Sequence, residues 1–350
     1  MASQKPLHNR VDRKVLREQL AQSEQARTTV SFYKYWNIPD IQQFRDDLFR
    51  DWQELGVLGR TYVSAEGINA QVSVPYDRFE AFREHLYAID WLNGLRLNVA
   101  VEDDGKSFFK LTIKIKEKIV ADGIHDPAFD ATNCGEHLKA AEFNEITDRD
   151  DTLLVDMRNH YESEVGHFEG AVCPDVDTFR EEIEVLEKLA EQHKEGPIVM
   201  YCTGGIRCEK ASAYLRHKGY DNVYQLEGGI IEYTRRAQEA GLRNKFIGKN
   251  FVFDERMAER ISEDVIAQCH QCGKPADDHT NCANLACHTL FIQCAECAEK
   301  YDGTCGPECQ EIIHLPEEEQ EAVRKAWQQN PDGFRKGRKV KSRFLDNTDG

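Results

Sequence analysis

The strongest constraint on the fold lies between residues 197 and 219, where the apolar run PIVMYC is followed by two glycines and a helical pattern, RCEKASAYLRHKG. A run without polar alternation is typical of a strand buried on both faces of a parallel sheet. Two similar runs, TLLVDMR and NVYQLEGG, lie before and after it, and the helical pattern DTFREEIEVLEKLAEQHKEG precedes it. This alternation from about residue 123 to 241 predicts an α/β domain with a parallel sheet.

The loop CTGGIR, which begins at Cys202, connects this strand to its helix at the edge where open α/β sheets bind ligands. Its glycines allow several backbone N–H groups to turn toward one point, and the helix N-terminus and an arginine add positive charge. The loop therefore predicts an activated cysteine, as thiolate or persulfide, although a cysteine at a strand end can also be simply packed. Cys208, in the first helical turn, fits either packing or a resolving thiol. The predicted site consists of Cys202 and Arg207 as catalytic residues and Thr203, Gly204, Gly205 and Ile206 as the anion-binding loop.

Residues 28 to 101 are predicted to form a ferredoxin-like (acylphosphatase-like) α+β unit. Four segments rich in β-branched and aromatic residues have strand character: TTVSFYKYW, VLGRTYVSA, GINAQVSV and LRLNVAV. Helical patterns, IPDIQQFRDDLFRDWQELG and PYDRFEAFREHLYAID, fall after the first strand and after the third. The resulting order β-α-β-β-α-β is that of the ferredoxin-like fold.

The segment LTIKIKEKIV, residues 111 to 120, alternates apolar residues with lysines. As a strand it places Leu111, Ile113, Ile115 and Ile119 on one face and Lys114, Lys116 and Lys118 on the other. The lysine face fits either an edge strand protected against aggregation or a surface that contacts phosphates.

Eight of the twelve cysteines lie between residues 269 and 309. Pairs separated by two to four residues suit tetrahedral thiolate coordination, so the pattern predicts two Cys₄ zinc sites. We favour interleaved pairing, which joins the two C-x₂-C pairs, over sequential pairing. Free or disulfide-bonded cysteines, an iron–sulfur centre, and ligation by His270, His279 or His288 remain alternatives. The predicted metal ligands are Cys269, Cys272, Cys282, Cys287, Cys294, Cys297, Cys305 and Cys309.

Three segments of the central domain resemble the rhodanese family: VDMRNHYESEVGHFEGAV, YCTGGIRCEKAS and LEGGI. The resemblance implies that Cys202 carries sulfur as a persulfide and that Thr203 to Arg207 form its cradle. Asp156 and Arg158 match signature residues, which we interpret as structural, in a buried ion pair or a strand-end cap.

The arrangement of the whole chain resembles the rhodanese-domain tRNA uridine hydroxylases. An N-terminal unit with SAEGINAQVSV, the loop YCTGGIRCEKASAYL and a cysteine-rich C-terminal segment carry this resemblance. It implies dioxygen-dependent hydroxylation of C5 of the wobble uridine of tRNA, the first step towards uridine 5-oxyacetic acid, with an electron donor that the sequence does not identify. The alternatives are a rhodanese-type sulfurtransferase and a redox-sensing scaffold built on zinc thiolates.

There are two interpretations of how the cysteine takes part in hydroxylation. In one, Cys202 adds to C6 of the uracil ring while Arg207 and the loop amides stabilise the developing anion. In the other, a persulfide on Cys202 acts as nucleophile or reductant. The sequence favours neither.

The domain boundaries follow from these patterns: an N-terminal extension (1–27), the ferredoxin-like domain (28–120), the rhodanese domain (121–245), a cysteine-rich zinc-binding region (246–330) and a basic tail (331–350). The formal net charge of −17 weakens long-range attraction to RNA, so contact with the anticodon arm is expected from local cations: the lysine face and the tail RKGRKVKSR, which could also be only a solubilising end. No apolar stretch long enough to span a membrane and no secretory signal is present, which predicts a cytoplasmic enzyme without membrane partners.

Overall fold

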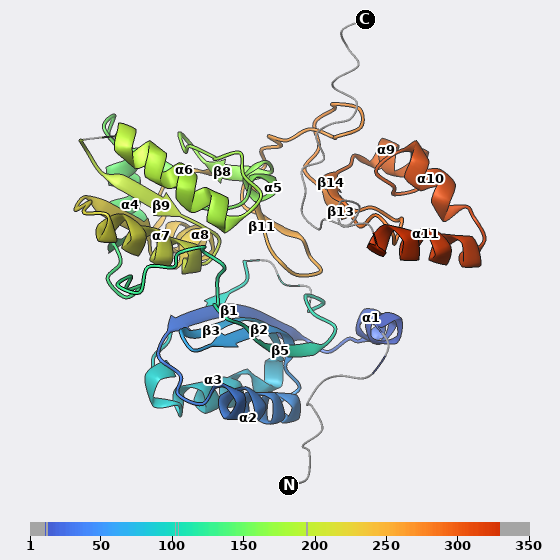
Figure 1. Ribbon diagram of the computed structural model, residues 1–350, viewed down its shortest axis with the longest axis horizontal. Helices are drawn as coiled ribbons and strands as arrows, with labels where there is room; N and C mark the ends of the chain where they lie inside the picture. Colours follow the sequence, from blue (N-terminus) through green and yellow to red (C-terminus); the bar gives the residue numbers. More distant parts are fainter. Residues whose placement is uncertain (1–10, 12, 102, 104, 194, 330–350) are drawn as a thin grey trace, which may run out of the picture.

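Figure 1 shows the computed structural model of the chain, which describes residues 11, 13–101, 103, 105–193 and 195–329. An N-terminal sheet with its helices, a central parallel sheet and a C-terminal cysteine-rich region follow one another along the sequence. The predicted basic tail and the first ten residues lie outside the described residues. Within the described residues, no helix is long and apolar enough to cross a bilayer.

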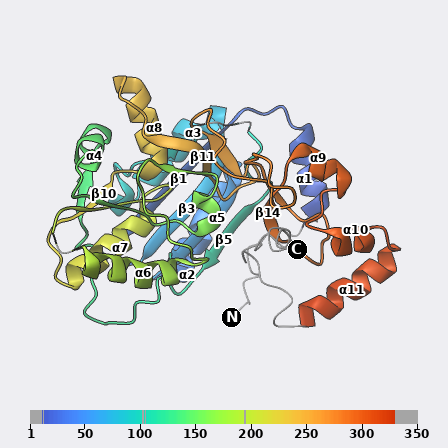
Figure 2. The same ribbon diagram turned by 90° about the horizontal axis from the view of Figure 1, so that it is seen from above.

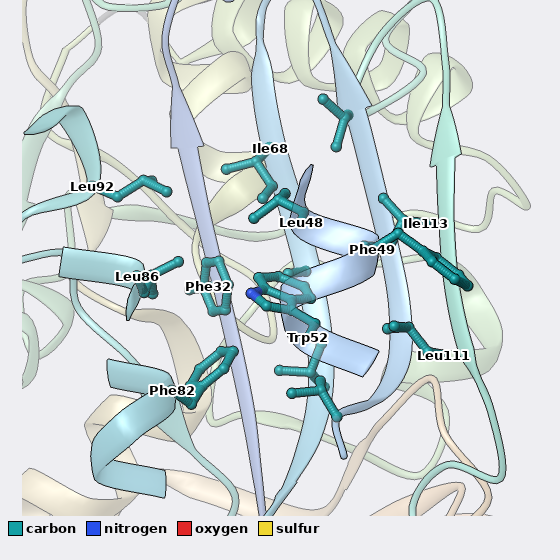
Figure 3. Packing of buried hydrophobic residues seen from close by; sticks show 14 of the residues in the cluster. Phe32, Leu48, Phe49, Trp52, Ile68, Phe82, Leu86, Leu92, Leu111 and Ile113 are labelled. Atoms are coloured by element: carbon teal, nitrogen blue, oxygen red, sulfur yellow. The ribbon is translucent and has the colours of Figure 1, made fainter. Parts of the chain in front are cut away.

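The N-terminal domain has the predicted ferredoxin-like order. Strands β1 (Arg27–Tyr35), β2 (Leu58–Ser64), β3 (Gly67–Pro75) and β4 (Asn98–Val99) are joined by helices α2 (Ile41–Glu54) and α3 (Phe79–Tyr87). With the later strand β5 (Leu111–Ile115), the sheet order is β4-β1-β3-β2-β5. The Asp40 side chain caps α2 by accepting a hydrogen bond from the Gln43 amide at 2.9 Å. Both helices cover one face of the sheet, where Trp52 packs against Phe32 and Phe82 (Figure 3). The opposite face is turned toward the central domain (Figure 1).

The lysine-rich segment does not form the single alternating strand that the sequence predicts. Strand β5 (Leu111–Ile115) pairs in parallel with β2 but ends at Ile115, because the last residue of β2 that pairs with it is Val63. Ile115, expected on the buried face, is 42 % exposed, whereas Ile113 is buried. Lys116 and Lys118 therefore lie beyond the strand, and the three lysines do not share one strand face.

The central domain is the predicted parallel α/β fold. Strands β6 (Glu136–Leu138), β10 (Val223–Leu226), β9 (Ile198–Tyr201) and β7 (Leu153–Asp156) form a parallel sheet in that order. Helices α6 (Phe179–Gln192) and α7 (Ile206–His217) pack on one face, and α4 (Ala140–Thr147) and α8 (Gly229–Ala240) on the other. Alternate residues of β9 face the two layers: Met200 contacts the α6 and α7 layer, and Val199 the α4 and α8 layer.

A small antiparallel sheet leads from the central domain to the C-terminal region. It consists of β8 (Gly166–Phe168), β11 (Phe246–Phe251) and β12 (Ala258–Arg260), with α5 (His160–Ser163) preceding β8. The hairpin of β13 (His279–Asn281) and β14 (Leu290–Ile292) follows, and then α9 (Ala295–Lys300), α10 (Pro307–Ile313) and α11 (Glu317–Gln329). Figure 2 shows these last three helices to one side of the two larger domains. Helix α1 (Arg13–Gln22) joins the regions through an ion pair between Arg17 and Glu255.

Candidate active site and cysteine clusters

The loop that carries Cys202 connects β9 to α7, as the sequence predicts. Strand β9 ends at Tyr201 and α7 begins at Ile206, with Gly205 as its N-cap at a φ of +100°. This conformation is one that side chains rarely adopt. A Cβ atom at Gly205 would also lie 2.9 Å from the hydroxyl of Tyr33, so glycine is required for both reasons.

The Cys202 thiol is fully buried, and its environment favours the thiolate. Burial by itself raises the pKa, but a hydrogen bond from the Cys208 thiol, the charge of Arg207 and the amides at the start of α7 outweigh it and lower the pKa of Cys202 to about 5. The Gly205 amide donates to Sγ at 3.1 Å. Burial and the neighbouring Cys202 raise the pKa of Cys208 well above its usual value. The environment therefore favours the thiolate at Cys202, and the Cys208 thiol stays protonated and donates a hydrogen bond to it.

The Arg207 side chain forms a buried ion pair with Glu162 in addition to its position beside the Cys202 loop. Its two terminal nitrogens donate to the two carboxylate oxygens at 2.6 and 2.8 Å, and Glu162 is fully buried. The guanidinium also lies 5.9 Å from the ring centroid of Phe253. Sequence reasoning missed Glu162. Its available signal was the capping pattern Asn159-x-x-Glu162, in which Glu162 accepts from the Asn159 amide at 3.1 Å, and this pattern indicates a helix start rather than a partner for Arg207.

Asp156 and Arg158 form the buried ion pair that the sequence interpretation favoured. Arg158 donates to the two oxygens of Asp156 at 2.8 and 2.6 Å and to the carbonyl of Gly166 at 2.6 Å. Both side chains are fully buried. The pair holds the end of β7 against β8, which is a structural role.

The N-terminal sheet covers the Cys202 loop. Tyr35 donates its hydroxyl to the Ile206 carbonyl at 3.2 Å, and the Asn98 amide group donates to the Gly204 carbonyl at 3.4 Å. Lys210 of α7, 1 % exposed, reaches the Glu66 carboxylate at 2.9 Å and also contacts Asp122. The candidate site therefore lies at a junction of two domains.

Three hollows follow one another across this junction. A cavity of about 580 Å³ lies at the β1 and β4 edge, lined by Tyr33, Asn98 and Gly204 among others. A small cavity of about 40 Å³ shares Asn98 with it, and a groove of about 660 Å³ at the β2 and β5 edge shares Phe253 with the small cavity. The 40 Å³ cavity therefore shares lining residues with both the 580 Å³ cavity and the 660 Å³ groove.

The three candidate lysines of residues 114 to 118 have different surroundings. Lys114 lines the 660 Å³ groove together with Arg17, Arg60 and Tyr62. The ammonium of Lys116 lies 5.6 Å from the ring centroid of Tyr62. Lys118 donates to the Asp122 carboxylate and to the Ile124 carbonyl, both at 2.5 Å. Only Lys114 of the three lines the groove.

The eight C-terminal cysteines gather in two groups of four with interleaved pairing. Within each group the sulfur atoms all lie within 4.8 Å of one another, and one pair of the first group and two pairs of the second lie at 3.7 Å. A disulfide would require about 2.05 Å. A tetrahedron with metal–sulfur bonds of about 2.3 Å has edges of about 3.8 Å, so both groups fit a tetrahedral ion. The groups are Cys269, Cys272, Cys294 and Cys297, and Cys282, Cys287, Cys305 and Cys309.

Neither group includes a histidine among the described residues. His270 bonds to the Glu164 carboxylate at 2.8 Å, and His279 packs against the Phe251 ring with a centroid distance of 5.1 Å. Two sulfur atoms of the second group accept hydrogen bonds. The Cys305 amide donates to Cys282 Sγ and the Asn284 side chain donates to Cys309 Sγ, each at 3.3 Å. Such donors stabilise thiolate charge.

Three family models match the chain. Residues 27–119 match a UPF0176 acylphosphatase like domain, residues 139–236 a rhodanese-like domain, and residues 247–310 a rhodanase C-terminal model. The chain is 58 % identical over 319 residues to a protein of Yersinia enterocolitica named tRNA uridine(34) hydroxylase, covering 91 % of each chain. A protein of the same name from Enterobacter sp. is 55 % identical over 333 residues, 95 % of each. A solved rhodanese-like domain from Anabaena sp. is 22 % identical over 32 % of this chain and 78 % of that one, with a TM-score of 0.25.

Proposed function

The chain belongs to the family of tRNA uridine(34) hydroxylases, and from this premise we propose that it hydroxylates C5 of the wobble uridine with dioxygen, using Cys202. The observation that carries the role of Cys202 is its buried sulfur, whose pKa is lowered to about 5 at the start of a helix beside a cavity between two domains. Because the substrate is tRNA, we place the enzyme in the cytoplasm, where its thiols stay reduced.

In the proposed reaction, Cys202 Sγ adds to C6 of uracil, and the electron pair of the C5–C6 double bond moves to C5 and O4. The loop amides and the positive charge of Arg207 stabilise this anion. The outer sulfur of a persulfide on Cys202 can make the same addition. Hydroxylation puts one oxygen atom of dioxygen on C5, and the other leaves as water, which requires two electrons and two protons. Loss of the C5 proton then expels the sulfur from C6 and restores the C5–C6 double bond. An external thiol reductant is the class of donor that we propose.

We propose that the anticodon arm lies along the 660 Å³ groove. Its lining combines Lys114, Arg17 and Arg60 with the aromatic rings of Tyr62 and Tyr161. Cations contact the phosphate backbone, and aromatic rings stack on unpaired bases, as in other single-stranded RNA sites. This local cationic surface provides the attraction to RNA that the net charge of −17 does not. Lys114→Ala is expected to weaken tRNA binding several-fold and to reduce its salt dependence.

We also propose that each four-cysteine group holds one structural Zn²⁺. Four thiolates without an open position are typical of a structural site rather than a catalytic one. The purified protein should contain about two zinc ions per chain by elemental analysis. Folded protein without bound metal would contradict this proposal.

The experiment for the hydroxylase proposal is mass spectrometry of nucleosides from tRNA incubated in air with the wild-type protein, Cys202→Ala and the control Cys173→Ala. Cys173 is a half-buried thiol outside the loop. We expect 5-hydroxyuridine from the wild type and the control but not from Cys202→Ala. If Cys202→Ala stays active, the proposed role of Cys202 is wrong. If the wild type forms a persulfide from thiosulfate but no 5-hydroxyuridine, the protein is a sulfurtransferase instead.

A further inference from the structure

The 580 Å³ cavity between the N-terminal sheet and the Cys202 loop has the size of a small-molecule or nucleobase site. Strand β1 contributes Tyr33 and Tyr35, and the Cys202 loop contributes Gly204. The two tyrosine rings lie edge to face with centroids 6.1 Å apart. The cavity thus combines aromatic surface with the backbone of the loop that holds the nucleophile.

Asn98 lines this cavity and carries an unpartnered acceptor. Asn98 is only 4 % exposed. The carboxamide is oriented by its donation to the Gly204 carbonyl at 3.4 Å, which leaves Oδ1 buried without a hydrogen-bond partner. An unpaired buried acceptor costs about 1 to 3 kcal/mol, so one that persists at a cavity wall needs an explanation.

A second unpartnered group lies close by. The hydroxyl of Thr203 is also buried without a hydrogen-bond partner, and Thr203 lines the small cavity that shares Asn98 with the larger one. The backbone on both sides of Asn98 and Thr203 is fixed: Asn98 pairs with Ser31 in the sheet, and the Thr203 carbonyl accepts from the Ile231 amide at 3.3 Å. These two polar groups therefore stay in place with their hydrogen-bonding capacity unused.

We propose that this cavity receives the uracil ring of the substrate nucleotide and that Asn98 Oδ1 accepts the N3–H of the ring. This inference rests on the proposed function and deepens it, because it names the residue that recognises the base. Uracil presents a donor at N3 between two carbonyl acceptors, so a ring whose N3–H meets Asn98 brings one carbonyl toward the adjoining 40 Å³ cavity, where the Thr203 hydroxyl can donate to it. Cytosine has an acceptor at N3, which would face the Asn98 oxygen and be rejected.

The position of the cavity fits the chemistry of the site. The Gly204 carbonyl forms part of its wall, and the next residue, Gly205, donates its amide to Cys202 Sγ at 3.1 Å. Cys202 is fully buried, so the ring reaches Sγ only when the groups that cover the sulfur move. Asn98 is a positioning residue in this scheme: it holds the ring and takes no part in the bond changes.

The test compares three anticodon stem-loops that carry uridine, 3-methyluridine or cytidine at the wobble position. Methylation at N3 removes the donor that Asn98 would recognise and leaves C5 and C6 unchanged. For the wild type we expect kcat/KM for uridine to exceed that for 3-methyluridine by at least about 100-fold. In Asn98→Ala, kcat/KM for uridine should fall by at least about 10-fold, and the preference over 3-methyluridine should shrink to less than about 5-fold.

Asn144→Ala is the matched control, because Asn144 uses its amide to bond Arg243 and Tyr233 outside the cavity. This variant should keep the wild-type preference. If Asn98→Ala keeps both the rate and the preference, the proposal is wrong. Asn98→Ser takes the place of Asn98→Ala if thermal unfolding shows that the alanine variant does not fold.

Binding of the same stem-loops to Cys202→Ala, with and without Asn98→Ala, separates this proposal from the proposed function. A preference for uridine that depends on Asn98 supports the base pocket even if the wild type makes no 5-hydroxyuridine. Equal binding of all three stem-loops by both proteins, together with intact hydroxylation by Asn98→Ala, overturns the pocket and leaves the hydroxylase proposal standing.

Discussion

Cys202 and the eight cysteines between residues 269 and 309 differ in what surrounds their sulfur atoms. Around Cys202 the protein itself stabilises the thiolate, through the Gly205 amide, the Cys208 thiol and the charge of Arg207. In the C-terminal groups each sulfur atom lies within 4.8 Å of three other sulfur atoms, with three pairs at 3.7 Å, an arrangement that suits thiolates sharing a cation. A protein can thus use one side chain as a nucleophile or as a structural ligand, depending on the source of the compensating charge.

The two regions also differ in how they are held together. The parallel sheet has apolar layers on both faces, including Phe143, Phe168, Ile183 and Leu186. The second cysteine group has a core of Cys282, Cys309 and Phe291 as its buried members. The C-terminal region has little apolar surface to bury, so its stability should depend on the metal.

The largest expected effect is therefore that of metal removal. A strong chelator under reducing conditions should abolish hydrogen-exchange protection of the amides around both cysteine groups, because metal binding contributes on the order of 10 kcal/mol to the folding of such sites. Strand β9 and helix α7 should stay protected. Restoring zinc should restore protection. If the amides remain protected after elemental analysis shows loss of the metal, the contrast between the two regions is not correct.

The second effect concerns the charge balance of the Cys202 loop. Glu162→Gln should lower the free energy of unfolding by about 3 to 5 kcal/mol, because the variant leaves the buried guanidinium of Arg207 without its carboxylate. Denaturant unfolding measures this loss. Asp47→Asn, which removes an exposed ion pair with Arg50, is the control and should cost less than about 1 kcal/mol. A similar small cost for both variants would show that Arg207 is compensated in another way.

The third effect is the acidity of Cys202. Its pKa is lowered to about 5, so the thiolate should predominate from about pH 6 upward. The rate of alkylation by iodoacetamide, followed residue by residue with mass spectrometry, should therefore reach half its plateau near pH 5 at Cys202. Burial raises the pKa of Cys173 to about 12, so its rate should still increase at pH 9. Identical pH profiles at the two cysteines would contradict the predicted activation.

The smallest effect concerns Glu182, a fully buried residue of α6 whose two carboxyl oxygens have no hydrogen-bond partner. Burial and the nearby Asp156 raise its pKa to about 9. The folded protein therefore keeps this carboxyl protonated while the unfolded chain ionises it above about pH 4.5, so stability from this group falls as pH rises from about 4.5 to 9.

Glu182→Gln removes this titration. Between pH 5 and pH 6 the variant should lose less stability than the wild type, with a difference of about 1 kcal/mol. Denaturant unfolding at both pH values measures the difference and cancels any constant cost of the buried amide. An equal change in both proteins would mean that Glu182 is ionised in the folded state.

Much of the site could be predicted from local sequence. The apolar run of β9, the glycines and the helix after them locate Cys202 in a strand-to-helix loop, because buried strands and helix starts have short-range signatures. The spacing of the cysteines indicates metal sites for a similar reason, since a tight turn brings both members of a pair to one ion. The lysine segment shows the limit: lysines recur at every second residue to Lys118, but β5 ends at Ile115, where its pairing with β2 ends.

The sequence alone determined the fold class and singled out the Cys202 loop and the two groups of cysteines, because each depends on residues close together in the chain. Tertiary structure decided which distant groups meet. Asn98 and Gly204 are 106 residues apart, and Arg207 and Glu162 are 45 apart. The first contact arises because one face of the N-terminal sheet packs on the Cys202 loop, and the second because α5 places Glu162 against Arg207. Which faces meet depends on the packing of whole domains, and no local period in the sequence records it.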